Sequence, residues 1–128
     1  MNKQTLALLA LLMALSANTF AAPPKCYSSH GGYCQYTGKV SRIYINRWNM
    51  ILLYFDKPIA VSEPAKAGFI IKNRSAAAFN VRENPEFAKL LYSTALTAQA
   101  SGRNVTIQMR GSQSGYLKFD RIWLAAPK

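Results

Sequence analysis

The sequence contains few of the side chains on which catalysis usually depends. Among its 128 residues are five carboxylates and a single histidine, His30, which lies between two serines and two glycines in a segment typical of an exposed turn. No spacing marks two carboxylates as the general acid and general base of one cleft, and a Ser28–His30 hydrolase would have no supporting acid. We therefore expect a protein that is not an enzyme and that has no cofactor.

Cysteine is scarce as well, with only Cys26 and Cys34 present. In an exported chain such a pair is more often oxidised than free. The loop between them, YSSHGGY, contains Gly31-Gly32, which permits the tight reversal that a bridge requires. We expect a Cys26–Cys34 disulfide, which would stabilise the fold by about 2–3 kcal/mol on the loop-entropy model. An oxidised pair leaves no thiolate for catalysis or for a zinc site, so no metal is expected.

Long apolar runs are absent beyond the N-terminus. Residues 6–15 form an apolar run that is too short to span a bilayer comfortably. Lys3 gives a positively charged N-terminal region, and residues 19–22 contain the small residues typical of a signal-peptidase cleavage site. This pattern predicts a secretory signal peptide over residues 1–22 and a secreted or periplasmic mature protein with no transmembrane segment. The remaining residues, 23–128, suit a single domain.

The shortage of acidic residues makes the chain strongly basic. Its formal net charge is +11, and removing the leader with Lys3 lowers it to +10. Such an excess attracts anions in general, including phosphate backbones, acidic glycans and anionic membrane surfaces, without selecting one of them. Export makes nucleic acid the least favoured of these partners.

One helix is clearly marked in the sequence, over Asn84–Gly102. Asn84 is a good N-cap, Pro85 suits the first helical position, and Gly102 suits the left-handed residue that ends a helix. Helical spacing predicts a core-facing stripe made of Phe87, Leu90, Leu91, Thr94, Ala95 and Ala98. The opposite face has little charge and consists of Lys89, Tyr92, Ser93, Leu96 and Ala100. It is either an apolar surface face or, as we expect, an oligomer interface.

The rest of the mature chain is predicted to be mainly β. Strand patterns cover Lys39–Ile45, Met50–Phe55, Gly68–Lys72, Ala76–Val81, Asn104–Arg110 and Tyr116–Leu124. Residues 23–37 are expected to form a loop held by the disulfide, and Pro64 argues against a regular element in residues 59–67. A slip in the alternation of the first strand predicts a bulge or bend. Three or four strands, one helix and two strands, in the order β-β-β-α-β-β, favour a small OB-fold barrel.

The segments Phe87–Ala98 and Ser101–Ile107, with Gly38-Lys39-Val40 before them, resemble the B subunits of pentameric bacterial toxins of the subtilase-cytotoxin and pertussis-like kind, and related secreted proteins. The resemblance covers about two-thirds of the mature chain. It implies an OB-fold, a ring of five copies whose helices line a pore, and an outer surface that binds host glycans, often sialylated ones. Whether an A subunit exists stays open. The second cysteine follows the first by only eight positions, whereas the family usually ties its N-terminal region to a distant strand.

Two candidate binding sites follow from the residue types. Sugars are bound by aromatic faces and short polar side chains on rigid loops, and the residues in or just after the disulfide loop that fit are Tyr27, Ser28, Ser29, Tyr33 and Tyr36. An anion would be bound by basic and aromatic residues of the strands, as OB-folds bind single strands. These are Arg42, Arg47, Trp48, Lys72 and Arg74.

The favoured interpretation is therefore a secreted, non-enzymatic protein that self-associates, as a pentamer if the resemblance holds, and binds a glycan or glycoconjugate. The alternative is a periplasmic basic protein that binds an anionic polymer or a protein partner.

Overall fold

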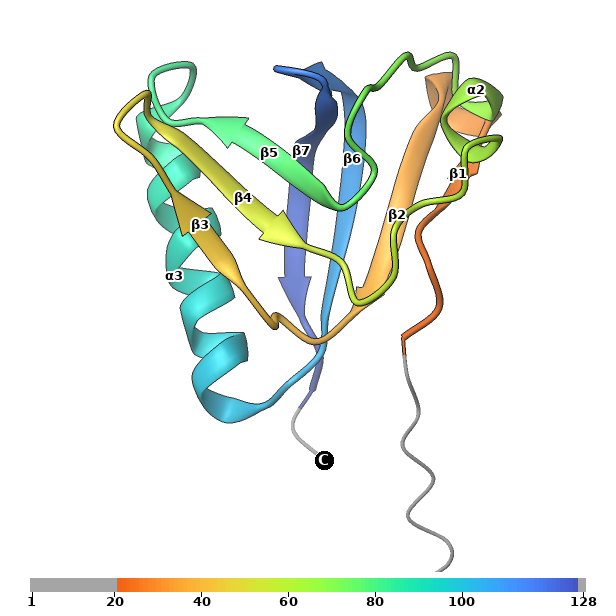
Figure 1. Ribbon diagram of the computed structural model, residues 1–128. Helices are drawn as coiled ribbons and strands as arrows, with labels where there is room; N and C mark the ends of the chain where they lie inside the picture. The colour runs from red at the N-terminus through yellow and green to blue at the C-terminus, as the bar shows by residue number, and fades with distance from the viewer. Residues whose placement is uncertain (1–20, 127–128) are drawn as a thin grey trace, which may run out of the picture.

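The computed structural model describes residues 21–126 and shows a mainly β protein with one main helix (Figure 1). The predicted signal peptide, residues 1–22, lies almost wholly outside the described residues. In chain order the elements are β1 (Lys25–Tyr27), the 3₁₀ turn η1 (Ser29–Gly31), β2 (Tyr33–Gly38), β3 (Ile43–Ile45), β4 (Met50–Tyr54), α2 (Glu63–Lys66), β5 (Ala76–Asn80), α3 (Pro85–Ser101), β6 (Val105–Gln113) and β7 (Tyr116–Leu124). None of the described helices is long and apolar enough to cross a membrane.

The strands form one open sheet of seven strands in the order β1-β2-β6-β7-β5-β4-β3. Strands β2 and β3 follow one another in the chain but lie in different halves of the sheet, because β2 pairs with β6 while β3 pairs with β4. Residues 39–42 connect these halves at the bottom of Figure 1. All strand pairs are antiparallel except β5 with β7, where Ala77 lies opposite Leu117.

The core lies inside the curl of this sheet. Strand β6 contributes Val105, Ile107 and Met109, each fully buried, as the alternation of apolar residues predicts. Strand β7 adds Leu117 and Phe119 from the same side of the sheet. Helix α3 runs beside β3 and β4 at the left of Figure 1 and turns its own apolar stripe toward this core.

The predicted helix is confirmed, together with both of its end signals. The Asn84 side chain accepts a hydrogen bond of 3.1 Å from the Phe87 N–H, and Gly102 ends the helix with φ 66°. The buried stripe differs in part from the expected one. It consists of Ala88, Leu91, Ala95 and Ala98, while Leu90 is 67% exposed. Leu90 precedes Leu91 by one residue, which is about 100° around the helix axis, so it lies outside the buried face.

Two segments expected to be irregular contain regular structure. Residues 23–37, expected as a loop, form β1, η1 and most of β2, because the disulfide joins two short strands rather than the ends of a loose turn. Residues 59–67, expected as an irregular connection, contain the single turn of α2. Pro64 is compatible with it because it occupies the first turn, where its missing N–H has no intrahelical partner.

Two predicted strands also differ from the structure. The stretch Lys39–Ile45 is a strand only from Ile43 onward, because residues 39–42 cross between the two halves of the sheet. Residues 68–72 are not a strand at all. The N–H groups of Lys72 and Asn73 both donate to the Gly115 carbonyl, at 2.8 and 2.9 Å, instead of joining a ladder.

Candidate functional site

The predicted disulfide is present and joins β1 to β2. Cys26 lies directly opposite Cys34 in the ladder, and both side chains are buried. Between them the chain reverses through three consecutive residues with positive φ, His30, Gly31 and Gly32. The loop therefore has a fixed conformation that depends on the covalent bridge and on glycine.

Beyond the bridge, Tyr27 and Tyr33 occupy opposite positions of the same two strands. Their rings stack with centroids 5.1 Å apart and an interplanar angle of 28°. Tyr27 is 41% exposed, Tyr33 is half-buried, and Ser28 and Ser29 lie exposed beside them. Four of the five predicted sugar-binding residues are thus gathered on one small surface, which we call the tyrosine surface.

Arg110 of β6 supports this surface from below. Its Nη1 donates to the His30 carbonyl at 2.6 Å and to the Gly32 carbonyl at 3.1 Å, and the guanidinium lies 5.5 Å from the centre of the Tyr33 ring. Its Nε also lies 3.6 Å from a carboxylate oxygen of Asp120. Arg110 was not predictable as a supporting residue from the sequence, because its role depends on strand pairing that brings together residues 80 positions apart.

The fifth predicted residue, Tyr36, does not belong to the tyrosine surface. It is 1% exposed and packs against Phe55 with ring centroids 5.1 Å apart. Its hydroxyl donates to the Lys39 carbonyl at 3.2 Å and accepts from the Asp56 N–H at 3.3 Å. Burial raises the pKa of Tyr36 to about 12. Tyr36 is a core residue that a sugar could not reach without unfolding.

The candidate anion-binding residues lie at the two ends of the β3–β4 hairpin and before β5. Arg47 is in the turn of the hairpin, where its guanidinium group stacks on Trp48 at 4.8 Å. Arg42 is at the open end, where it stacks on Tyr54 at 3.7 Å. The other two, Lys72 and Arg74, precede β5, and Nη1 of Arg74 donates to the Ile59 carbonyl at 3.0 Å.

The candidate oligomer interface lies where α3 faces the edge strand β3. Tyr92 and Leu96 border an open hollow together with Ile43 and Ile45 of β3. A second, wholly apolar hollow continues alongside it and is lined by Ile45, Ile51, Val81, Pro85, Ala88, Lys89 and Tyr92. Leu96 is 40% and Ile45 52% exposed, so this apolar surface is accessible on both elements. The predicted residues Ser93 and Ala100 are exposed on the same helix.

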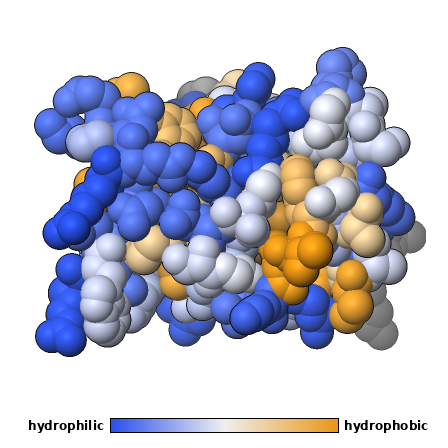
Figure 2. Space-filling view, turned by 90° about the horizontal axis from the view of Figure 1, so that it is seen from above, coloured by the Kyte–Doolittle hydropathy of each residue, from blue (hydrophilic) through white to orange (hydrophobic). Residues whose placement is uncertain are grey.

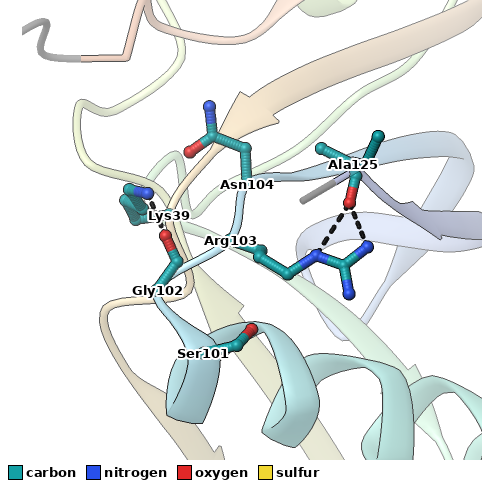
Figure 3. Close-up of a pocket in the computed structure, with 7 residues that line it drawn as sticks. Lys39, Ser101, Gly102, Arg103, Asn104 and Ala125 are labelled. Atoms are coloured by element: carbon teal, nitrogen blue, oxygen red, sulfur yellow. Dashed lines mark hydrogen bonds between the residues drawn. The ribbon is translucent and has the colours of Figure 1, made fainter. Parts of the chain in front are cut away.

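A further hollow at the C-terminal end of α3 is closed by the protein's own charges (Figure 3). The Lys39 ammonium group donates to the Gly102 carbonyl, and Nε of Arg103 donates to the Ala125 carbonyl at 2.8 Å. Lys39 therefore neutralises part of the negative charge at the C-terminal end of α3, while Arg103 links the residue after the helix cap to the end of β7. This region joins the helix to the last strand, and Ser101 and Asn104 line it beside the two cations.

The described residues contain no group of His, Cys, Asp and Glu side chains that could hold a metal ion. Comparison of the chain with protein-family models, with curated proteins and with solved structures found no match.

Proposed function

We propose that this protein is a secreted or periplasmic, non-enzymatic carbohydrate-binding domain with an OB-fold that self-associates in the manner of a toxin B subunit. The observation that carries the binding function is the stacked Tyr27–Tyr33 pair on a disulfide-fixed loop.

Strand pairing supports the OB-fold. Treated as one bent strand, β2 and β3 pair with both halves of the sheet, and α3 connects β5 to β6. Strands β5 and β7 are parallel neighbours, which brings the strand before the helix next to the last strand. A five-stranded Greek-key barrel with a bent first strand would have these pairings, and β1 would be an addition at its edge.

Chemistry supports a sugar as the ligand of the tyrosine surface. A stacked aromatic pair presents a flat apolar face to the C–H groups of a pyranose, while the neighbouring serine hydroxyls can bond sugar hydroxyls. Arg110 fixes the loop carbonyls, so the surface is formed before the ligand arrives and little entropy is lost on binding.

Binding to a glycan array by the mature, oxidised protein tests this proposal. Tyr27→Ala is expected to weaken binding by about tenfold or more, because it removes the exposed ring of the pair. Tyr44→Ala is the matched control, since Tyr44 is 45% exposed on the distant strand β3. Equal losses in the two variants, or no selective glycan at all, would refute the proposal.

The alternative, binding of an anionic polymer or a protein partner, is favoured by the β3–β4 hairpin alone. There two arginines stack on aromatic rings, Arg42 on the partly buried Tyr54 and Arg47 on the exposed Trp48, as in proteins that bind polyanions. Such binding would fall steeply with salt and would be lost in Arg47→Gln but retained in Tyr27→Ala.

A further inference from the structure

An apolar patch lies at the end of the molecule that carries α2, well exposed to solvent. Ile70 is 88% and Val61 77% exposed, the two highest values among the large hydrophobic residues of the part of the chain that the structure describes. Together with Phe69 and Ile71 they line an open hollow beside α2. Figure 2 views the molecule from this end and shows a group of apolar residues at the lower right, with hydrophilic residues next to it. We call Val61 and Ile70 with this hollow the α2 patch.

The exposure of Ile70 does not result from a loose loop. The helix α2 ends in a Schellman motif, in which the Phe69 N–H donates to the Pro64 carbonyl at 2.9 Å and the Gly68 N–H to the Ala65 carbonyl at 3.0 Å. Phe69 and Ile71 on either side of Ile70 pack against the core. Because its neighbours are anchored inward, Ile70 is held pointing outward.

Positive charge lies beside this patch, because Lys72 and Arg74 line the same hollow. Residues 57–74 contain four cationic side chains, Lys57, Lys66, Lys72 and Arg74, and one carboxylate, Glu63. That carboxylate is already engaged, since one oxygen accepts from the Cys26 N–H at 2.8 Å and the other from Lys66 at 2.5 Å. Lys57 and Lys72 are exposed. The hollow therefore has two projecting apolar side chains beside the cationic Lys72 and Arg74, in a segment of net charge +3.

We propose that the α2 patch docks on the surface of an anionic lipid bilayer. Projecting aliphatic side chains enter the boundary between headgroups and acyl chains, while lysines contact lipid phosphates. A protein partner would instead need an acidic, concave surface, whereas the bilayer matches both the protrusion and the charge without further assumptions. This inference is independent of the sugar-binding function, because the two surfaces use different residues.

Co-sedimentation with vesicles tests this proposal, comparing phosphatidylcholine alone with phosphatidylcholine containing phosphatidylglycerol. We expect binding only to the anionic vesicles. The double variant Val61→Ser with Ile70→Ser should lower the partition coefficient by about tenfold or more, and Lys72→Gln by about fivefold. The matched control is Leu90→Ser, which removes an apolar side chain 67% exposed on α3 and should leave partitioning unchanged.

A second measurement reports depth of insertion. In a background with Trp48→Phe and Trp123→Phe, Ile70→Trp should shift its emission to shorter wavelength when anionic vesicles are added. Unshifted emission, or equal partitioning of the double variant and the wild type, would overturn the proposal. The proposal would also be overturned if the protein bound heparin as strongly as vesicles and if high salt abolished both interactions. That result would show that the basic residues bind polyanions in general. Tyr27→Ala should retain vesicle binding, so failure of either proposal is distinguishable from failure of the other.

Discussion

At the scale of single residues, Glu63 closes one edge of the sheet. Strand β1 is the outermost strand on this side, and the carboxylate of Glu63 accepts a hydrogen bond from its Cys26 N–H. The same carboxylate bonds to Lys66, and its side chain is 15% exposed. Hydrogen bonds from Lys66 and from the Cys26 N–H lower the pKa of Glu63 below its usual value.

This pKa shift predicts a pH dependence of stability. The stabilisation by ionised Glu63 is complete above the pKa of the unfolded chain and is lost as the pH falls through the lower pKa of the folded state. Urea unfolding from about pH 6 down to about pH 2 should therefore show a smaller loss of stability in Glu63→Gln than in the wild type. Glu86→Gln is the control, because Glu86 is 85% exposed. A pH profile unchanged by Glu63→Gln would show that this carboxylate does not hold the edge.

The tyrosine surface shows what sequence can and cannot predict at this scale. Its aromatic and hydroxyl residues are neighbours in the chain, so the disulfide loop alone indicated Tyr27, Ser28, Ser29 and Tyr33. Tyr36 was included because it is another tyrosine near the loop. It lies two residues after Cys34 in the same strand, however, so the side chains of Cys34 and Tyr36 point to the same face and are both buried in the core. The supporting Arg110 could not be predicted, because only the β2–β6 pairing brings it under the loop.

At the scale of elements, Gly32 and Gly68 both have positive φ, but we expect their replacement by alanine to lower stability by different amounts. A Cβ at Gly32 would lie 2.4 Å from the Ala67 carbonyl oxygen, whereas a Cβ at Gly68 would meet nothing within 4 Å. We expect Gly68→Ala to lower the free energy of unfolding by about 1–2 kcal/mol, through backbone strain alone. Gly32→Ala should cost clearly more, because the disulfide loop and the end of α2 must move apart. Equal midpoints in urea for the two variants would contradict the close contact.

Elements were predictable where local signals mark their ends. The cap residues of α3 define it without reference to the rest of the fold. The opposite holds for residues 68–72, whose Phe-Ile-Ile run has the composition of a strand. There the Schellman motif after α2 and the contact with Gly115 fix the backbone instead. A propensity for strand has no effect where no neighbouring strand is available to pair.

At the scale of the whole molecule, composition and element order were sufficient to predict a mainly β protein with one main helix. The seven-stranded sheet was not predictable in detail, because its edge strand β1 has only three residues, too few for a periodic pattern to be recognised. The other edge strand, β3, was predicted, but as the end of a longer strand over Lys39–Ile45. The two edges differ in what lies beside them. Glu63 covers the outer side of β1, whereas Ile45 of β3 lines the apolar hollow beside α3.

That asymmetry makes the β3 and α3 surface the site at which we expect copies of the chain to associate. An edge strand with exposed Ile45 beside exposed Leu96 is a surface that natural proteins usually cover. Light scattering of the mature protein at two salt concentrations should give a mass of several protomers that persists in high salt. Leu96→Glu should reduce it to the monomer mass without loss of stability, because Leu96 borders the hollow beside β3 and association would bury the new charge. Leu90→Glu, on the same helix but outside this hollow, should leave the assembly intact. A monomeric wild type, or dissociation by both variants alike, would show that this surface is not the interface.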